Sequence, residues 1–107
     1  MRIYISVPIS GLDERKQREK ADLTKAALSR AGHKPVNPFE ICAGKNPEYI
    51  DYLVYDLRAL YDCDAIYMCD GWQDSKGCRV EWFFAKTYGK KVIYETEPES
   101  DYFYFNR

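Results

Sequence analysis

One glutamate stands where a purely structural glutamate is unexpected. A helix is predicted to begin at Ser75, and on a helical wheel of about 100° per residue Glu81 falls within its apolar face. The other residues of that face carry no charge: Gly77, Phe84, Ala85 and Tyr88. A carboxylate among apolar side chains is usually paired, bonded to the backbone or used in chemistry. Glu81 is therefore the first candidate catalytic residue, with a lysine pair or a backbone cap as the alternatives.

The start of the same helix predicts a place for an anion. Ser75 suits the N-cap position, where a hydroxyl and free backbone N–H groups gather at the positive end of the helix dipole. Gly77 removes any side chain one turn before Glu81, which leaves room for a ligand. A carboxylate and an anion-binding helix start therefore share one small region, although a plain N-cap is also a sufficient reason for Ser75.

Composition excludes several reaction classes. The single histidine, His33, follows Gly32 at a predicted helix end and is interpreted as a turn residue. Without a second histidine or a Cys–His spacing, neither zinc catalysis nor a Ser-His-Asp triad is expected. Asp70 and Asp74 form no recognisable cation cage, so we predict no metal and no cofactor. Catalysis would then depend on carboxylates, hydroxyls and tyrosines.

The overall composition indicates a small cytoplasmic protein. Its 107 residues suffice for one domain, and the net charge of −1 provides no basic surface for nucleic acid. No run reaches the roughly 18 apolar residues that span a bilayer, and the first residues lack a signal-peptide pattern. The four cysteines have no CxxC spacing, so reduced thiols are expected. Neither nucleic acid nor a membrane is therefore an expected partner.

The elements that must position these residues alternate between strand and helix. Strands are predicted over residues 2–7, 33–38, 65–69 and 91–94. Helices are predicted over residues 13–31, 46–62 and 75–88. This order predicts a single α/β domain with a doubly wound, mostly parallel sheet, a flavodoxin-like or Rossmann-like three-layer sandwich. The expected strand order is 2-1-3-4, with room for a fifth strand.

The predicted topology brings three loops to one edge of the sheet. Pro35 cannot donate a ladder hydrogen bond, so the second strand should lie at an edge, which agrees with the strand order. In such sheets ligands bind outside the carboxyl ends of the strands. The loops expected there span residues 7–12, 39–45 and 70–75. Ser10 and Gly11 in the first loop are candidate substrate-binding residues, and Trp72 in the third is a candidate stacking surface for a base, with packing as the alternative.

Two further predictions concern packing. The apolar residues of the first helix lie in its second half, at Leu23, Ala27, Leu28 and Ala31. Residues 95–107 read as an acidic linker followed by an aromatic tail, and the tail is expected to dock on its own or a neighbouring subunit. The whole chain, residues 1–107, is interpreted as one domain that includes this linker and tail.

The order of several short motifs resembles a known superfamily. The motifs are residues 3–11 (IYISVPISG), 32–38 (GHKPVNP), 56–65 (DLRALYDCDA) and Ser75-x-Gly77-x-x-x-Glu81. Together they resemble the nucleoside 2-deoxyribosyltransferase-like superfamily, and most closely its small branch called DUF4406. The superfamily includes deoxyribosyltransferases, which exchange bases on 2′-deoxyribonucleosides, and N-glycosidases, which release the base of nucleoside 5′-monophosphates to water.

The resemblance implies a role for each matched residue. Glu81 matches the nucleophilic glutamate, which forms a glycosyl-enzyme intermediate. Tyr4 matches the tyrosine that holds this glutamate, and Asp56 matches a helix aspartate near the base and sugar. Ser75 stands where the monophosphate hydrolases place a phosphate-binding serine and the transferases an aspartate. Val7 stands where the family usually has glycine, which predicts a side chain that crowds a ligand over the first loop.

Three classes of function remain open from the sequence. The first is an N-glycosidase that acts on a (deoxy)nucleoside 5′-monophosphate, or a nucleoside 2-deoxyribosyltransferase. The second is a non-catalytic sensor or sequestering protein that binds a nucleotide or nucleoside, and the third is an interaction module that uses the aromatic tail. From the residues alone, Tyr4 can equally be a core tyrosine and Asp56 an exposed residue beside a buried stripe. The resemblance also implies a homodimer or larger homo-oligomer.

Overall fold

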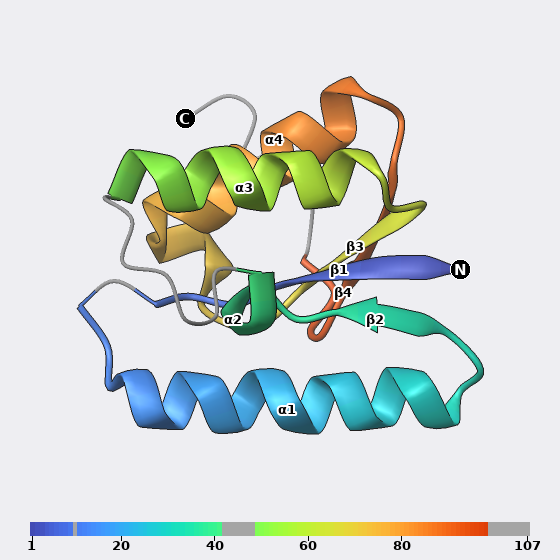
Figure 1. Cartoon of the computed structure of the whole chain (residues 1–107), viewed down its shortest axis with the longest axis horizontal. Helices are drawn as coiled ribbons and strands as arrows, with labels where there is room; N and C mark the ends of the chain where they lie inside the picture. Colours follow the sequence, from blue (N-terminus) through green and yellow to red (C-terminus); the bar gives the residue numbers. More distant parts are fainter. Residues whose placement is uncertain (10, 42–48, 99–107) are drawn as a thin grey trace.

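Four short strands form one parallel sheet. The strands are β1 (Arg2–Ser6), β2 (Lys34–Val36), β3 (Ala65–Met68) and β4 (Lys91–Tyr94). They lie in the order β2-β1-β3-β4 with every neighbouring pair parallel, which confirms the predicted α/β topology (Figure 1). Pro35 lies in the edge strand β2, as its missing N–H requires. The computed structural model describes residues 1–9, 11–41 and 49–98.

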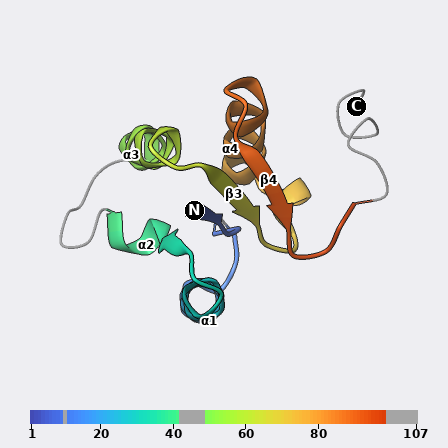
Figure 2. The same cartoon turned by 90° about the vertical axis from the view of Figure 1, so that its right-hand side faces the viewer.

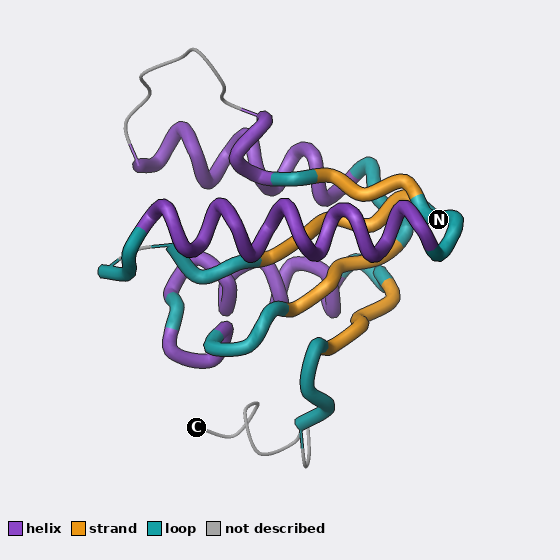
Figure 3. Tube along the Cα trace, turned by 90° about the horizontal axis from the view of Figure 1, so that it is seen from below, coloured by secondary structure: helices purple, strands orange, loops and turns teal. Residues whose placement is uncertain are grey.

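Helices cover both faces of the sheet. The elements are α1 (Glu14–Arg30), α2 (Pro38–Ile41), α3 (Tyr49–Tyr61), the 3₁₀ turn η1 (Trp72–Asp74) and α4 (Lys76–Thr87). Figure 2 shows α1 on one side of the strands and α3 with α4 on the other. Seen from the α1 side, this helix lies in front of the sheet and runs roughly along the length of the strands (Figure 3). Within the described residues, no helix combines the length and apolar composition that crossing a bilayer requires.

The helix boundaries follow local signals in the sequence. The Asp13 carboxylate caps α1 by accepting from the Arg15 N–H at 3.0 Å, and Gly32 follows the helix with φ near +89°. Residues 39–45 were expected to form a loop, and for the described part this is wrong, because α2 begins at Pro38. The Asn37 side chain accepts from the Phe39 N–H at 2.9 Å, so Asn37 and Pro38 form an N-cap and N1 pair.

Two apolar clusters lie on opposite faces of the central strand β1. The cluster beneath α3 and α4 includes Tyr4, Leu60, Ile66, Met68, Trp72 and Trp82. The cluster beneath α1 comprises Ile5, Val7, Ala21 and Cys69. Alternate side chains of a strand point to opposite faces, so β1 contributes to both clusters. Three of the four cysteines, Cys63, Cys69 and Cys78, are buried free thiols, and Cys42 lies outside the described residues.

The buried faces of two helices differ from the prediction. In α1 the sheet-facing residues are Ala21 and Thr24, with Leu28 partly buried beside them, whereas Leu23 is 71% exposed. Small residues suit this face because they let the helix lie close to the sheet. In α4 the buried residues are Cys78, Glu81, Trp82 and Ala85. The predicted face included Glu81 and Ala85 correctly, but Tyr88 is exposed.

Candidate active site

Glu81 is the buried carboxylate around which the candidate site is built. It lies on the sheet-facing side of α4 and is only 5% exposed. The Tyr4 hydroxyl donates to Glu81 Oε2 at 2.6 Å, and the Ser6 hydroxyl donates to Glu81 Oε1 at 2.8 Å. Each carboxylate oxygen therefore has its own buried donor, which is what a desolvated carboxylate needs.

Strand β1 supplies both donors, because residues two apart in a strand point to the same face of the sheet. Tyr4 and Ser6 point to the same face of the sheet, towards α4, while Ile5 and Val7 point to the α1 face. The predicted crowding by Val7 is wrong for this reason, since its side chain packs beneath α1 and away from Glu81. Ser6 was missed by the sequence analysis. The period of two from Tyr4 is the signal that could have found it.

Burial dominates the electrostatics of the site. It raises the pKa of Glu81 to about 8, and the nearby Asp56 carboxylate adds to the rise, against the hydrogen bonds from Tyr4 and Ser6. Burial likewise raises the pKa of Asp56, in α3, to about 7. The pKa of Tyr4 lies well above its usual value because it is fully buried beside both carboxylates. The phenol therefore stays protonated and able to donate.

The single phenolic proton of Tyr4 makes the two carboxyl groups unequal. Tyr4 donates its hydrogen bond to Glu81, and its hydroxyl also lies close enough to Asp56 to lower the pKa of that carboxyl. One hydroxyl proton serves only one acceptor well. When Glu81 is the anion and Asp56 holds a proton, this hydrogen bond stabilises the charged Glu81 carboxylate.

The N-terminus of α4 lies one and a half turns from Glu81. Ser75 is the N-cap, and its hydroxyl oxygen accepts from the Cys78 N–H at 3.3 Å. The N–H groups of Lys76 and Gly77 precede this bond and point out of the helix start. The hydroxyls of Ser6 and Ser75 both lie near the Cys78 thiol and oppose the burial that raises its pKa to about 11. Cys78 thus links the helix start to the Glu81 environment.

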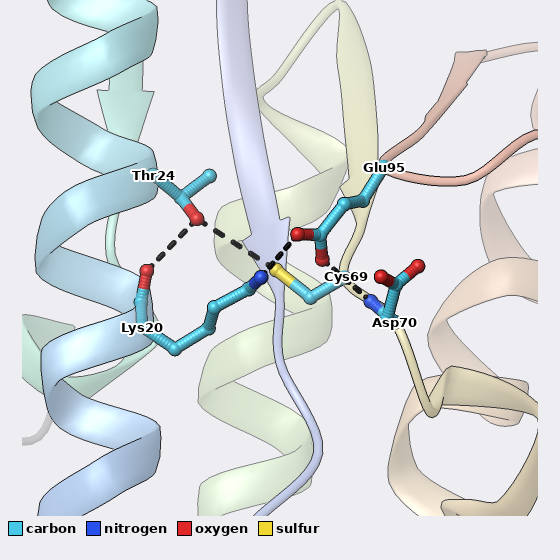
Figure 4. Close-up of polar contacts among 5 residues, drawn as sticks. All are labelled: Lys20, Thr24, Cys69, Asp70 and Glu95. Atoms are coloured by element: carbon cyan, nitrogen blue, oxygen red, sulfur yellow. Dashed lines mark hydrogen bonds and ion pairs between the residues drawn. The ribbon is translucent and has the colours of Figure 1, made fainter.

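The loop that delivers Ser75 is anchored from the opposite face of the sheet. Glu95 Oε1, just after β4, accepts from the Asp70 N–H at 2.8 Å, and Glu95 Oε2 pairs with the Lys20 ammonium of α1 (Figure 4). Thr24 of α1 lies 4.0 Å from the Cys69 sulfur in the same cluster. Partial burial opposes ionisation of Glu95, but the Asp70 N–H and Lys20 lower its pKa. The start of the loop is therefore tied to α1 and β4.

The remaining predicted site residues are placed less favourably. Trp72 is 2% exposed and stacks on Trp82 with ring centroids 5.5 Å apart, so its indole packs in the core rather than facing a ligand. Gly11 lies in the exposed first loop with φ near +77°. Ser10 lies outside the described residues. Within the part of the chain that the structure describes, no group of three His, Cys, Asp or Glu residues could hold a metal ion.

The sequence matches one defined family. Residues 1–94 match the domain of unknown function DUF4406. The chain belongs to this family. A search of curated proteins finds no match to it.

Two solved structures share the fold of this DUF4406 chain. One is the 2-deoxyribosyltransferase from the psychrotolerant bacterium Bacillus psychrosaccharolyticus, with 18% identity, a TM-score of 0.72 and coverage of 99% of this chain and 81% of that one. The other is the CMP N-glycosidase BcmB of Clostridium botulinum, with 21% identity, a TM-score of 0.62 and coverage of 96% and 77%. At these identities the likeness establishes a common fold.

We predict that Glu81→Gln makes the protein more stable in alkaline solution. A carboxyl whose pKa is raised by folding contributes stability that is full below pH 4.5 and is lost as the pH rises through about 8. The variant lacks this loss. Its free energy of unfolding should therefore exceed that of the wild type by on the order of 2 kcal/mol at pH 8.5, and by much less at pH 5.

Urea denaturation at the two pH values measures this difference. Glu19→Gln, which removes an exposed carboxylate from α1, is the matched control and should show no such dependence on pH. An equal stability difference between Glu81→Gln and wild type at both pH values would contradict the prediction.

Proposed function

We propose that this protein is an N-glycosidase that acts on a (deoxy)nucleoside 5′-monophosphate. The observation that carries the proposal is Glu81 itself, buried, bonded through each oxygen to a hydroxyl of β1, and six residues after the helix N-cap Ser75. Burial of a carboxylate without a cationic partner costs stability, and a nucleophile is one reason to keep it. The site also includes Ser6, the last residue of the central strand β1, and ligands of this architecture bind outside the carboxyl ends of the strands.

The solved structures that share this fold support the same class of chemistry. One neighbour is described as a 2-deoxyribosyltransferase and the other as a CMP N-glycosidase. Both activities break a bond between the sugar and the base of a nucleoside or nucleotide. The DUF4406 match itself carries no assigned activity, so the proposal for this chain rests on the residues of the site.

The proposed reaction has two steps. In the first, a Glu81 oxygen attacks C1′ of the sugar, the C1′–N bond breaks, and the base leaves with the bonding electron pair and a proton from Asp56. In the second, water adds to C1′ and gives a proton to Asp56, while the C1′–O bond to Glu81 breaks. Tyr4 holds Glu81 throughout. The raised pKa of Asp56, about 7, suits a group that both gives and takes a proton near neutrality.

The 5′-phosphate is assigned to the start of α4. The Ser75 hydroxyl and the N–H groups of Lys76 and Gly77 offer donors at the positive end of a helix dipole, which suits a phosphate better than a neutral sugar. Gly77 leaves space for the phosphate to approach the backbone. Ser10 and Gly11 of the first loop remain proposed substrate-binding residues. Trp72 is left out of the binding surface because its side chain is buried.

Transfer of the sugar to a second base is the alternative outcome of the same first step. The higher TM-score, 0.72, belongs to the deoxyribosyltransferase and favours keeping this possibility. A protein that binds the nucleotide without chemistry would use the same residues for binding.

We predict base release from at least one nucleoside 5′-monophosphate. Chromatography of a panel of ribo- and deoxyribonucleotides and free nucleosides, with and without an acceptor base, measures hydrolysis and transfer together. Glu81→Gln should lower the rate by at least about 10³-fold with nucleotide affinity retained, because only the nucleophile is removed. Glu19→Gln is the control and should keep the wild-type rate. Binding without release by the wild type would favour the sensor function instead.

We predict that Ser75→Asp discriminates against the phosphate. Aspartate is as good an N-cap as serine, so the helix should persist. A second negative charge about 4–5 Å from the phosphate should lower kcat/KM for monophosphates roughly 100-fold and leave free nucleosides nearly unchanged. Ser75→Asn, which caps without a charge, is the matched control. Equal losses for nucleotides and nucleosides would place the phosphate elsewhere.

We predict a homodimer or larger assembly. Ile50 and Val54 of α3 are each 58% exposed, and the outward face of α4 carries a shallow depression of about 470 Å³ lined by Lys76, Arg79, Val80 and Phe83. Exposed apolar surface over two neighbouring helices is typical of an interface. Light scattering after size exclusion should give at least twice the chain mass of 12.6 kDa. A single species at the chain mass would exclude the assembly.

A further inference from the structure

Ser6 and Tyr4 hold different atoms of the same carboxylate. Tyr4 donates to Oε2 and Ser6 donates to Oε1, so neither donor substitutes for the other. Both side chains are fully buried, and solvent therefore cannot replace either bond. A hydrogen bond to a charged group that is buried in this way is among the stronger ones in proteins.

The donors of the two oxygens lie at different positions along β1. Ser6 is the last residue of β1, and it pairs with Met68 at the end of β3, whereas Tyr4 pairs with Ile66 farther from that end. The carboxyl ends of the strands are the ligand-binding edge of a parallel sheet. Ser6 also lies near Cys78, on the first turn of α4. Oε1 is therefore the oxygen held on the side of the helix start, and Oε2 the oxygen held towards Asp56.

We propose that Ser6 is a second positioning residue for Glu81, which fixes Oε1 and stabilises the carboxylate whenever it is free of the sugar. This inference rests on the proposed function. In the first step Glu81 gives an electron pair to C1′ and loses its negative charge to the ester as the base departs. In the second step water adds to C1′, and the electron pair of the C1′–O bond returns to Glu81.

The Ser6 bond acts on the second step in particular. A hydrogen bond to a carboxylate is stronger than the same bond to a neutral ester, so the Ser6 hydroxyl favours the return of the electron pair to Glu81. Without it the ester should break down more slowly and accumulate. Ester accumulation is a readout that loss of general stability does not produce.

The same bond also lowers the pKa of Glu81 in the free protein, against the larger rise that burial causes. The titratable groups that face Glu81 are Tyr4 from β1, Asp56 from α3 and Cys78 on α4 itself. Tyr4 and Cys78 are neutral well above pH 8, because burial raises the pKa of each. A change in titration between pH 5 and 9 therefore reports on Glu81 and Asp56.

The test begins with the titration of Glu81 in the absence of any substrate. The δ-carbon of glutamate, labelled with ¹³C, is followed by NMR across this pH range, and the Glu81 signal is assigned by its loss in Glu81→Gln. Ser6→Ala should raise the pKa of Glu81 by about one unit, the size expected for losing one charge-assisted hydrogen bond. Ser6→Thr, which keeps the hydroxyl, should restore the wild-type value.

A matched control removes a buried hydroxyl from the other face of the sheet. Thr24→Val deletes the hydroxyl that donates to the Lys20 carbonyl oxygen at 2.8 Å, beneath α1. It should lower stability as much as Ser6→Ala does and leave the titration of Glu81 unchanged. An unshifted Glu81 titration in Ser6→Ala would overturn the inference, and so would an equal shift in Thr24→Val.

Turnover then separates this inference from the proposed function. With a nucleotide that the wild type cleaves, Ser6→Ala should move the acidic limb of kcat/KM to higher pH and accumulate the covalent ester, detected by mass spectrometry after an acid quench. If the wild type releases base, but Ser6→Ala shows an unchanged acidic limb of kcat/KM and accumulates no ester, the role of Ser6 is overturned and the proposed function is not. No base release by the wild type from any nucleotide would overturn the proposed function and, with it, the role in ester breakdown.

Discussion

Burial of the Glu81 carboxylate is the constraint on which the rest of the site depends. Within the described residues the carboxylate is bonded by two hydroxyls, those of Tyr4 and Ser6. Hydroxyl donors compensate desolvation only in part, and the pKa therefore stays raised, at about 8. A cationic partner would have lowered the pKa and also occupied the oxygens. With hydroxyl donors alone, the carboxyl holds its proton at acidic pH and becomes an anion as the pH rises through about 8.

The two faces of the sheet have separate tasks. On the face of α3 and α4 lie the polar groups of the site: Tyr4 and Ser6 of β1, Asp56 of α3 and Glu81 of α4. On the face of α1 lies an apolar cluster, and beside it the Lys20–Glu95 pair anchors the Asp70 backbone. The alternation of side chains along β1 makes this division possible within one strand. The anchoring of the loop and the chemistry of the site therefore do not compete for the same surface.

The sequence predicts those parts of the site that depend on local rules. The strand order, the Ser75 cap and the burial of Glu81 each follow from periodicity, capping preferences and topology. Ser6 was missed because a small serine in a strand looks like many others until the position of α4 is known. Trp72 was placed towards the ligand because its loop borders the predicted edge, but the tertiary structure turns the indole onto Trp82. The prediction that Leu23 packs on the sheet was wrong for a related reason: the smaller Ala21 and Thr24 face the sheet and let α1 lie closer to it.

The pairing of residues distant in sequence has a consequence for how this chain reaches its native state. Tyr4 and Glu81 are separated by 77 positions, and Ser6 and Glu81 by 75. The central strand β1 also pairs with β3, which is distant in sequence: Ile3 lies opposite Ala65. Contacts of such high contact order form late, because loop closure must precede them. On a ribosome the first strand would emerge long before its partners, so the Glu81 carboxylate and its two donors can meet only after residues 1–81 have been synthesised.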